Sequence, residues 1–400
     1  MSWPKLKLES LAVKEPYSFV GGPFGSKLTT RDYVESGIPV IRGSNMNNGR
    51  YIDMADFVFV TESKVREDLS SNLAKPGDLI FTQRGTLGQV AIIPSDGISD
   101  RYVVSQSQMK LTVDKAKANG LFLYYFFSSR EATERILSYV SSSGVPHINL
   151  TVMRNFEVPV PPIETQRGIA RTLSAYDDLI ENNRRRIQLL EQAARLLYKE
   201  WFVHLRFPGH EYARIIDGVP EGWEKTTFGD AVENFDRLRI PLSVMEREKR
   251  PGSFPYHGAA GILDHLDGFI FEGRFLLVGE DGTVVTQGNT AMLQLVEGKF
   301  WVSNHAHVVQ GQLVSTEYLF CFMSHYPITG HITGVAQPKL SQRNLNRISM
   351  LIPPANLLDM FQDSAEPMFN QIFNLKAVCD RLAKARDLLL PKLMNGEVAV

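Results

Sequence analysis

The stretch from Val158 to Phe202, VPVPPIETQRGIARTLSAYDDLIENNRRRIQLLEQAARLLYKEWF, restricts the possible folds of this chain more than any other. An alternation of four- and three-residue steps runs through it, marked by Ile169, Leu173, Tyr176, Ile180, Asn183, Ile187, Leu190, Ala194, Leu197 and Trp201. This spacing is typical of a coiled coil, because an ordinary core helix drifts off a strict seven-residue repeat. A polar member such as Asn183 can fix the register with a partner helix. The sequence therefore predicts one long helix that packs on another.

A fainter copy of this stretch closes the chain, from Met350 to Met394. Each stretch contains a proline pair near its start, and Pro is tolerated in the first turn of a helix. The second series follows the first at a constant offset, and its members are Met368, Ile372, Leu375, Cys379, Leu382, Arg386, Leu389 and Leu393. A repeat of this kind predicts a chain built as globule, helix, globule, helix. We place the first globular domain at 1–157, the central helix at 158–207, the second globular domain at 208–349 and the C-terminal helix at 350–400.

The two predicted helices have no other long helix to pack on, so we expect them to pair with each other. An antiparallel pair places one globular domain at each end, related by a pseudo-two-fold axis. The residues expected to form this seam and to contact partners are Leu173, Ile180, Asn183, Ile187, Leu190, Leu197, Ile372, Leu375, Leu382 and Leu389.

Both globular regions contain short runs rich in Val, Ile and Phe between Gly, Pro, Asp and Asn, which predict β-strands. Examples are GDLIFTQRG and QVAIIP in the first region, and RFLLVGEDGTVV and HAHVVQG in the second. Helices are predicted from Gly120 to Val140 and over STEYLFCFMSHY. The fold class is therefore mixed α/β. The globular regions resemble each other far less than the helices do, which suggests a fixed frame that carries exchangeable globular domains.

Catalytic and cofactor motifs are missing. GGPFGSKL has the glycines of a phosphate loop in the wrong spacing, and VPPI and IPPA lack the flanking residues of an amino-methyltransferase tetrad. His305 and His307 lie two apart on a predicted strand without an obvious third metal ligand. We therefore predict no catalytic, cofactor or metal residues in this chain. The two cysteines, the absence of a long apolar run and the lack of a signal sequence favour the cytoplasm.

Loops rich in Arg, Asn and Gln are the remaining candidates for function, because these side chains make bidentate contacts with guanine and adenine edges. For any one residue a turn or a solvated cation is the favoured explanation, but several such loops cluster in one domain. The candidates in the first domain are Lys27, Arg42, Asn45, Asn47, Arg50, Gln83, Arg84, Arg101, Gln106 and Gln108. Those in the second are Arg237, Arg239, Lys249, Arg250, His257, Gln287, Asn289, Asn304, His305 and His307. The net charge of −1 means that local patches or partner subunits must supply much of any attraction to phosphate.

The segment PVPPIETQRGIARTLSAYDDLIENNRRRIQLLEQAARLLYKEWFVHLRFPGHE resembles the first long helix of specificity subunits of type I restriction–modification systems. PFGSKLTTRDYVESGIPVIRGSNM and GVPEGWEKTTFGDAV resemble the starts of their two target-recognition domains, and AKARDLLLPKLMNGEVAV resembles their C-terminal end. The resemblance covers nearly the whole chain. It is weakest from Arg237 to Leu313.

The resemblance implies that each globular domain reads one half of a bipartite, asymmetric site in double-stranded DNA. It also implies that the helix pair sets the spacing of the half-sites and docks two methyltransferase (modification) subunits, which restriction subunits then join. S-adenosylmethionine, ATP and Mg are expected on those partners, in the cytoplasm of a bacterium or archaeon. PPANLLDMF departs from PPIETQ by lacking its Glu and Gln.

Two other classes of function stay open at this point. An enzyme that acts alone, a methyltransferase or nuclease, would transfer a methyl group or cut DNA without a partner. A structural coiled-coil adaptor would be indifferent to exchange of its globular domains, whereas a specificity subunit would change its DNA target.

Overall fold

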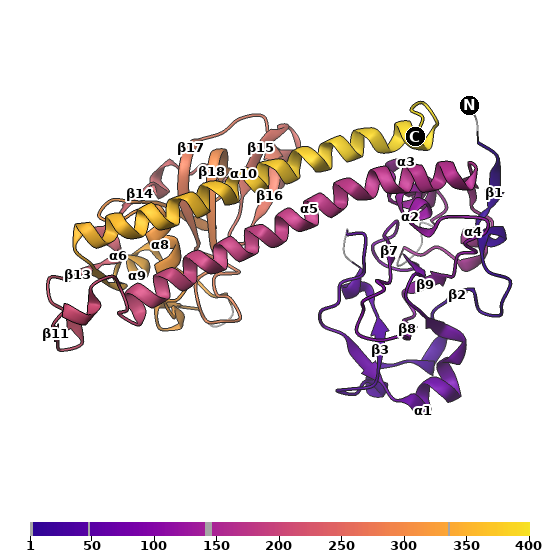
Figure 1. Cartoon of the computed structure of the whole chain (residues 1–400), viewed down its shortest axis with the longest axis horizontal. Helices are drawn as coiled ribbons and strands as arrows, with labels where there is room; N and C mark the ends of the chain where they lie inside the picture. Colours follow the sequence, from indigo (N-terminus) through magenta and orange to yellow (C-terminus); the bar gives the residue numbers. More distant parts are fainter. Residues whose placement is uncertain (1–2, 47–48, 141–145, 335–336) are drawn as a thin grey trace. The chain divides into compact units, whose positions relative to one another are not determined.

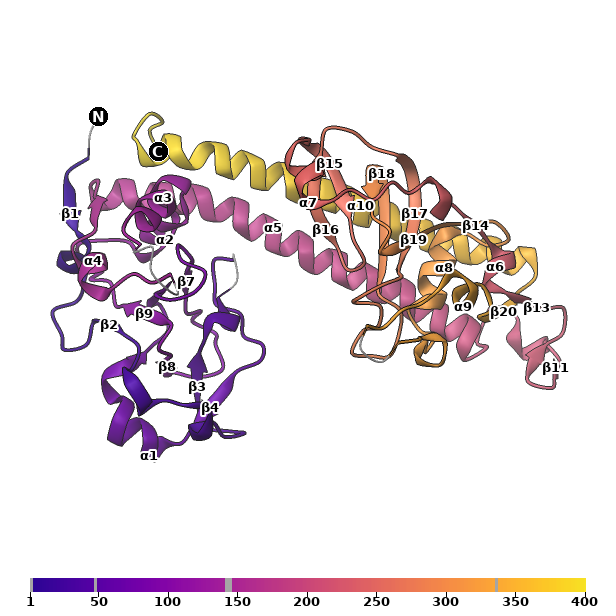
Figure 2. The same cartoon turned by 180° about the vertical axis from the view of Figure 1, so that it is seen from behind.

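A computed structural model describes residues 3–46, 49–140, 146–334 and 337–400 (Figures 1 and 2). Two compact units make up the chain. Unit 1 combines residues 1–181 with 379–400, and unit 2 contains residues 182–378. The boundary between them passes through both long helices, so each helix contributes one segment to each unit.

The two long helices are α5 (Ile163–Tyr198) and α10 (Ala355–Met394), drawn in magenta and yellow in Figure 1. In unit 1 the Cys379 thiol lies 3.7 Å from the Ile180 carbonyl oxygen, and Arg386 pairs with Asp177. In unit 2 the Lys376 ammonium lies 3.9 Å from Glu191. The rings of Tyr198 and Phe361 lie 6.1 Å apart in the same unit. Residue numbers therefore fall along α10 as they rise along α5, and the segments are antiparallel within each unit, as expected for two long helices that pair with each other.

Most of the predicted seam residues are apolar and at least half-buried. Ile180, Leu173, Ile372 and Leu375 are buried, whereas Ile187, Leu190, Leu197, Leu382 and Leu389 are half-buried. Asn183 is buried too, and its side-chain oxygen accepts a long hydrogen bond of 3.5 Å from Arg186 on its own helix.

In unit 1, a four-stranded antiparallel sheet has the order β2–β9–β6–β7. Helices α2 and α3 pack on it, and Phe81, Phe127 and Leu123 join its core to Leu173 of α5 and Leu393 of α10. A second sheet has the order β4–β3–β8–β5. The bounds are β1 Lys5–Lys7, β2 Phe19–Gly21, β3 Ile38–Ile41, β4 Val58–Val60, α1 Glu62–Lys64, β5 Leu73–Ala74, β6 Leu79–Thr82, β7 Val90–Ile92, β8 Tyr102–Val104, β9 Gln108–Leu111, α2 Gly120–Ser128, α3 Arg130–Ser138, α4 Leu150–Arg154 and β10 Glu157–Pro159.

In unit 2, one six-stranded sheet has the order β14–β19–β17–β18–β15–β16. Its core joins Leu276 and Val309 to Ala194 of α5 and Phe361 of α10. The bounds are β11 Ile215–Ile216, β12 Val219–Pro220, β13 Glu224–Thr227, α6 Phe228–Ala231, β14 Val232–Asn234, α7 Val244–Glu248, β15 Pro251–His257, β16 Ile262–Leu266, β17 Phe271–Gly279, β18 Leu293–Val302, β19 Ala306–Gly311, α8 Thr316–Met323, α9 Gln342–Asn346 and β20 Ser349–Ile352.

The two units share a topology. The orders β2–β9–β6–β7 and β14–β19–β17–β18 match strand for strand, and every neighbouring pair in both is antiparallel. The β1–β10 pair of unit 1 corresponds to the β13–β20 pair of unit 2. Asn149 caps α4 as Ser341 caps α9. The units differ in what is added: unit 1 carries a separate second sheet, whereas unit 2 extends its sheet by β15 and β16.

Substitution of Ile180 tests the seam in unit 1. Ile180→Ala removes a buried side chain and leaves a cavity, so we expect the free energy of unfolding to fall by about 2–4 kcal/mol. Leu179→Ala is the matched control, because the neighbouring Leu179 is 50% exposed and its loss costs about 0.5 kcal/mol or less. Urea denaturation of both variants measures the difference. Equal losses would contradict the assignment of Ile180 to the seam.

Candidate nucleic-acid interface

Four loops of unit 1 meet at one end of its four-stranded sheet, where β2 and β6 end and β9 begins. The Gly22 amide donates to the Gln108 carbonyl at 2.8 Å, and the Gln83 amide donates to the Ser107 carbonyl at 2.7 Å. The loop after β8 joins them through the Ser105 amide, 3.0 Å from the carbonyl oxygen of Ile41 at the end of β3. The segments 22–27, 42–46, 83–86 and 105–108 form this cluster, which we call the unit 1 loop cluster.

Gly22 makes this close approach possible. A Cβ atom at this position would lie 1.8 Å from the Ser105 carbonyl oxygen, which is backbone and cannot turn aside. Any larger residue therefore pushes the loop after β2 away from the loop after β8.

The unit 1 loop cluster has a polar surface with one exposed aromatic ring. Lys27 and Arg84 are exposed, and Gln83 and Gln106 are half-buried. Arg42 is half-buried and donates to the Asp56 carbonyl at 2.7 Å. Phe24 is 74% exposed. The sequence search missed Phe24 because it looked for polar residues, although an aromatic residue in the glycine-rich run GGPFGSK was a visible signal.

Two predicted contact residues of unit 1 prove to be structural. Asn45 is buried: its amide oxygen accepts from the Arg42 backbone at 3.0 Å, and its nitrogen donates to the carbonyl oxygens of Asp53 and Ala55. Gln108 is also buried and accepts from the Ser105 hydroxyl. Neither side chain has a surface with which to contact a base, so these two predictions are corrected.

Two predicted arginines have carboxylate partners in unit 1. Arg50 lies 2.5 Å from Asp178 of α5 and packs over the ring of Tyr51, and Arg101 lies 2.9 Å from Glu62. A contact with DNA would have to compete with these ion pairs. The predicted residue Asn47 lies outside the described residues.

The equivalent end of the unit 2 sheet is where β14 and β17 end and β19 begins. The Glu280 amide donates to the His305 carbonyl at 2.8 Å, and the Leu340 amide donates to the Glu280 carbonyl at 2.9 Å. The Val308 amide donates to the carboxylate of Asp236 at 2.8 Å. The segments 235–240, 280–282, 303–307 and 338–340 form this unit 2 loop cluster. Its exposed polar side chains include Arg237, Asn304 and His305.

A buried charged group lies beneath the unit 2 loop cluster. His307 has 0% exposure; its Nδ1 lies 2.6 Å from Asp236, and its Nε2 lies 2.8 Å from the Leu340 carbonyl oxygen. Both partners are acceptors, so both ring nitrogens carry hydrogen. Burial alone lowers the pKa of His307, but these hydrogen bonds and the charges of Asp236 and Glu280 outweigh it and raise the pKa above its ordinary value.

Arg239 also lies within the unit 2 loop cluster. Its guanidinium bonds Glu280 at 2.8 Å and the Ala306 carbonyl oxygen at 2.7 Å. The predictions that His307 and Arg239 contact DNA are therefore corrected, since both side chains are committed to internal partners. His257 is buried as well, its Nδ1 lies 2.9 Å from Gln294, and burial lowers its pKa.

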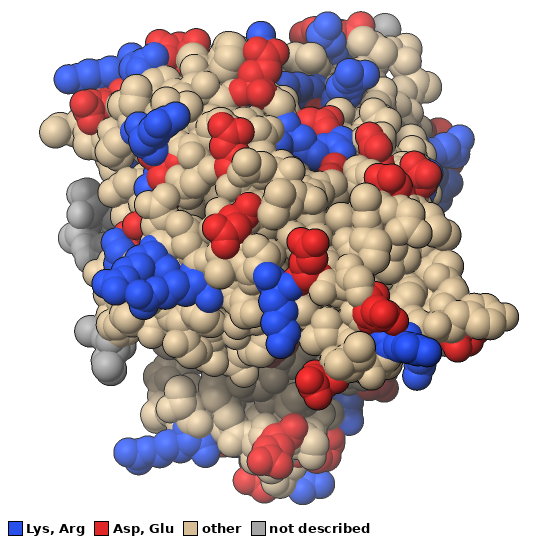
Figure 3. All heavy atoms as spheres, turned by 90° about the vertical axis from the view of Figure 1, so that its left-hand side faces the viewer, with Lys and Arg blue, Asp and Glu red and all other residues tan. Residues whose placement is uncertain are grey.

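The other candidates of unit 2 lie outside this loop cluster. Lys249, Gln287 and Asn289 are exposed, and Asn289 occupies a left-handed turn with φ of 63°. Arg250 lies 2.8 Å from Asp267 and packs over Trp301. Figure 3 shows Lys and Arg scattered among Asp and Glu over the face turned toward the viewer, in keeping with the nearly neutral net charge.

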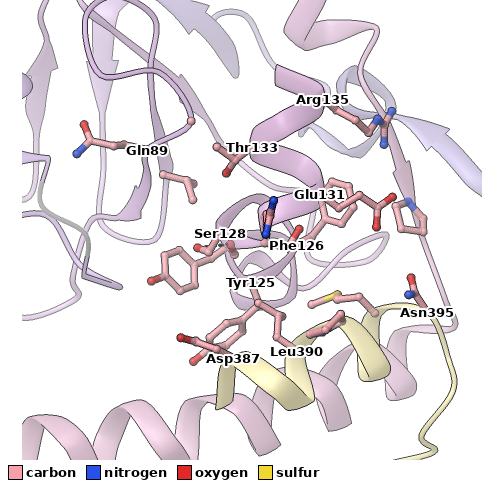
Figure 4. A pocket seen from close by; sticks show the side chains of 18 of the residues that line it. Gln89, Tyr125, Phe126, Ser128, Glu131, Thr133, Arg135, Asp387, Leu390 and Asn395 are labelled. Atoms are coloured by element: carbon pink, nitrogen blue, oxygen red, sulfur yellow. Dashed lines mark hydrogen bonds between the residues drawn. The ribbon is translucent and has the colours of Figure 1, made fainter. Parts of the chain in front are cut away.

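A groove of about 1040 Å³ in unit 1 borders the unit 1 loop cluster at Thr86. Figure 4 shows it between α3, which carries Glu131 and Arg135, and the end of α10, which carries Asp387 and Leu390. Its described lining contains neither His nor Cys. None of the described helices combines the length and apolar character that a bilayer span requires.

Comparison with known proteins identifies the family. The model of the type I restriction modification DNA specificity domain matches the chain twice, over residues 24–192 and 220–357. The chain belongs to this family. The first match includes strands β3 to β10 and the second includes β13 to β20, so the repeat seen in the topology is a repeat of the family domain. The resemblance found in the sequence is confirmed, and the chain is a specificity subunit rather than a catalytic one.

Relatives and solved structures agree with the family. The chain is 25% identical to the MjaIX type I restriction enzyme specificity subunit of Methanocaldococcus jannaschii, over 92% of this chain and 89% of that protein. A putative specificity subunit of Haemophilus influenzae is 33% identical over 36% of each chain. The crystal structure of an S subunit from M. genitalium aligns with a TM-score of 0.56 at 18% identity, over 98% of this chain and 96% of that one. This likeness confirms the mixed α/β fold.

Gly22→Ala tests the close approach in the unit 1 loop cluster. The added methyl group cannot fit beside the Ser105 carbonyl, so we expect unit 1 to lose about 2 kcal/mol or more of its free energy of unfolding. Gly120→Ala is the control, because nothing lies within 4 Å of a Cβ atom built there. Thermal unfolding compares the two variants. A Gly22→Ala protein as stable as the Gly120→Ala protein would contradict the packing of these loops.

Proposed function

We propose that this specificity subunit reads a bipartite, asymmetric site in double-stranded DNA, with one unit for each half-site. The observation that carries the proposal is the pair of loop clusters. Each lies at the same end of a topologically equivalent sheet, and the loops differ in sequence while the sheets and helices repeat. Two copies of one frame with different loops suit a target whose two halves differ in sequence.

The exposed side chains of the loop clusters have the chemistry for this task. Arg84, Arg237 and Asn304 are exposed hydrogen-bonding groups of the kind that read base edges in the major groove. Lys27 offers a positive charge to a phosphate group. Phe24 offers an apolar surface of the kind that contacts a thymine methyl group.

The proposal includes partner subunits. A net charge of −1 supplies little general attraction to DNA, so we infer that two modification subunits and the restriction subunits contribute phosphate contacts. S-adenosylmethionine, ATP and Mg belong to those partners in this proposal. The assembly acts on DNA in the cytoplasm, and the helix pair, which contributes to both units, sets the spacing of the half-sites.

Exposed leucines on the long helices support a docking role. Leu196 of α5 is 59% exposed and Leu388 of α10 is 70% exposed. The two residues occupy equivalent positions of the helix repeat, and one belongs to each unit. A large apolar side chain exposed twice at the same position suits two copies of one partner.

Arg84→Ala tests recognition by unit 1. We expect the methylated motif to become degenerate at one or two positions of one half-site, because loss of a bidentate contact costs about 1–3 kcal/mol of discrimination. Lys115→Ala is the control, since Lys115 is an exposed cation at the other end of β9. Methylation mapping in cells that carry the partner subunits measures the motif. Equal weakening at all sequences would make Arg84 a phosphate contact instead, and an unchanged motif would contradict its role.

Leu196→Glu and Leu388→Glu test the docking face. Each variant places a charge on one copy of the proposed contact, so we expect each to lose one modification subunit and the double variant to lose both. Gln192→Glu, one turn from Leu196, adds the same charge beside the contact and should assemble normally. Native mass spectrometry counts the bound subunits. Retention of both subunits by the double variant would contradict this docking face.

A further inference from the structure

The buried charges beneath the unit 2 loop cluster connect segments that are distant in sequence. Arg239 donates to Glu280 after β17, to the Ala306 carbonyl at the start of β19, and to the Asp236 carbonyl at 3.0 Å on its own loop. Its side chain is 13% exposed. One guanidinium therefore fixes three of the four segments at once.

The fourth segment is held by the same group of charges. Lys339 lies 3.3 Å from Glu280 and 3.2 Å from Asp281. The Leu340 carbonyl accepts from His307, whose other nitrogen donates to Asp236. Every segment of the unit 2 loop cluster therefore contacts one connected set of buried or half-buried charged side chains.

The donor atoms of Asp236, Glu280 and His307 lie within 4.8 Å of one another, a spacing that a metal ion could bridge. Their partners argue against a metal. Both nitrogens of His307 face acceptors, and Glu280 is bound by two cationic side chains, Arg239 and Lys339. The positive charge that a metal would supply is already present as protein side chains.

We propose that Asp236, Arg239, Glu280 and His307 are positioning residues for DNA recognition by unit 2. They hold the loops that expose Arg237, Asn304 and His305 in one arrangement, and discrimination at that half-site depends on them although none contacts DNA. The inference rests on the proposed function, since it assumes that unit 2 reads a half-site.

The physical reason is the cost of breaking such a set. Hydrogen bonds between charged groups are about twice as strong as neutral ones, and they fix geometry because a guanidinium is planar. Removal of one partner leaves another charge buried and unpaired, which is strongly unfavourable. The loops are therefore kept in one arrangement before DNA arrives, rather than ordered during binding, which saves the entropy of ordering them.

Unit 1 has no matching set among its described residues. Its loop cluster is joined by backbone hydrogen bonds and by the neutral amides of Asn45 and Gln108. A change in the protonation of His307 should therefore affect one half-site and spare the other.

The sign of the pH dependence follows from the raised pKa of His307. The groups that face it are the carboxylates of Asp236 and Glu280, with Arg239, Lys339 and Asp281 around them. Stabilisation by the charged ring is complete below its unfolded pKa of about 6.5, and it is lost as the pH rises through the higher folded pKa.

The test uses the assembled complex of this chain with its modification subunits. Duplexes altered at one base pair of either half-site compete with the intact target, and the ratio of affinities gives the discrimination. For Arg239→Gln and His307→Gln we expect roughly a tenfold loss of discrimination in the unit 2 half-site, with the other half unchanged. In the unaltered chain, discrimination in the unit 2 half-site should fall as the pH rises above about 6.5 and through the higher folded pKa of His307.

Arg274→Gln is the matched control. Arg274 is another half-buried arginine of unit 2, and it bonds Glu297, Glu317 and Asn370 away from the loop cluster. The Arg274→Gln variant should be less stable, but its discrimination in both half-sites should be unchanged. If the Arg239 and His307 variants do not fold, the pH dependence of discrimination in the unaltered chain still tests the positioning role.

The outcomes separate the two proposals. A complex that does not distinguish the altered duplexes at all contradicts the proposed function. A complex that does, but whose Arg239→Gln and His307→Gln variants keep full discrimination in the unit 2 half-site, overturns the positioning role alone. So does a loss of equal size in the Arg274→Gln control, or a discrimination in that half-site that is independent of pH.

Discussion

The pairing of α5 with α10 is the contact on which both units depend. In unit 1 the core beneath the sheet includes Ile169 and Leu173 of α5 with Leu390 and Leu393 of α10. In unit 2 the corresponding core includes segments of the same two helices. Neither sheet is covered by its own local helices alone. Each unit is therefore assembled from segments far apart in the sequence, and loss of the seam would expose apolar surface in both.

This dependence explains why the sequence revealed the frame so clearly. A helix that must match a partner over many turns keeps a strict heptad spacing, and that spacing is readable without a structure. Ile180 and Ile372 were identified in this way, and both are buried. The repeat of the globular regions was harder to detect, because the order of strands in a sheet is not evident from the amino-acid sequence. It appears when the sheet of β2, β9, β6 and β7 is compared with that of β14, β19, β17 and β18.

The loop residues show where sequence reasoning ends. Arg84 and Asn45 are both polar residues in glycine-containing loops, yet Arg84 is exposed, whereas Asn45 is buried and bonds neighbouring backbone groups. Whether a polar group faces solvent depends on which carbonyls come near it, and those carbonyls lie in segments that meet only in the folded unit. His307 was recognised as a member of a pair with His305, but its partners Asp236 and Leu340 are distant in the sequence.

The two units share one sheet topology but carry different loops at the equivalent end of the sheet. The central claim is therefore that each unit reads its own half of the target. A hybrid chain tests this most directly, in which residues 1–157 are replaced by the corresponding segment of a relative whose methylated motif is known. Methylation mapping with the partner subunits should then show one half of the motif replaced by the relative's half, with the other half and the spacing unchanged. A motif that changes in both halves, or in neither, would contradict the account.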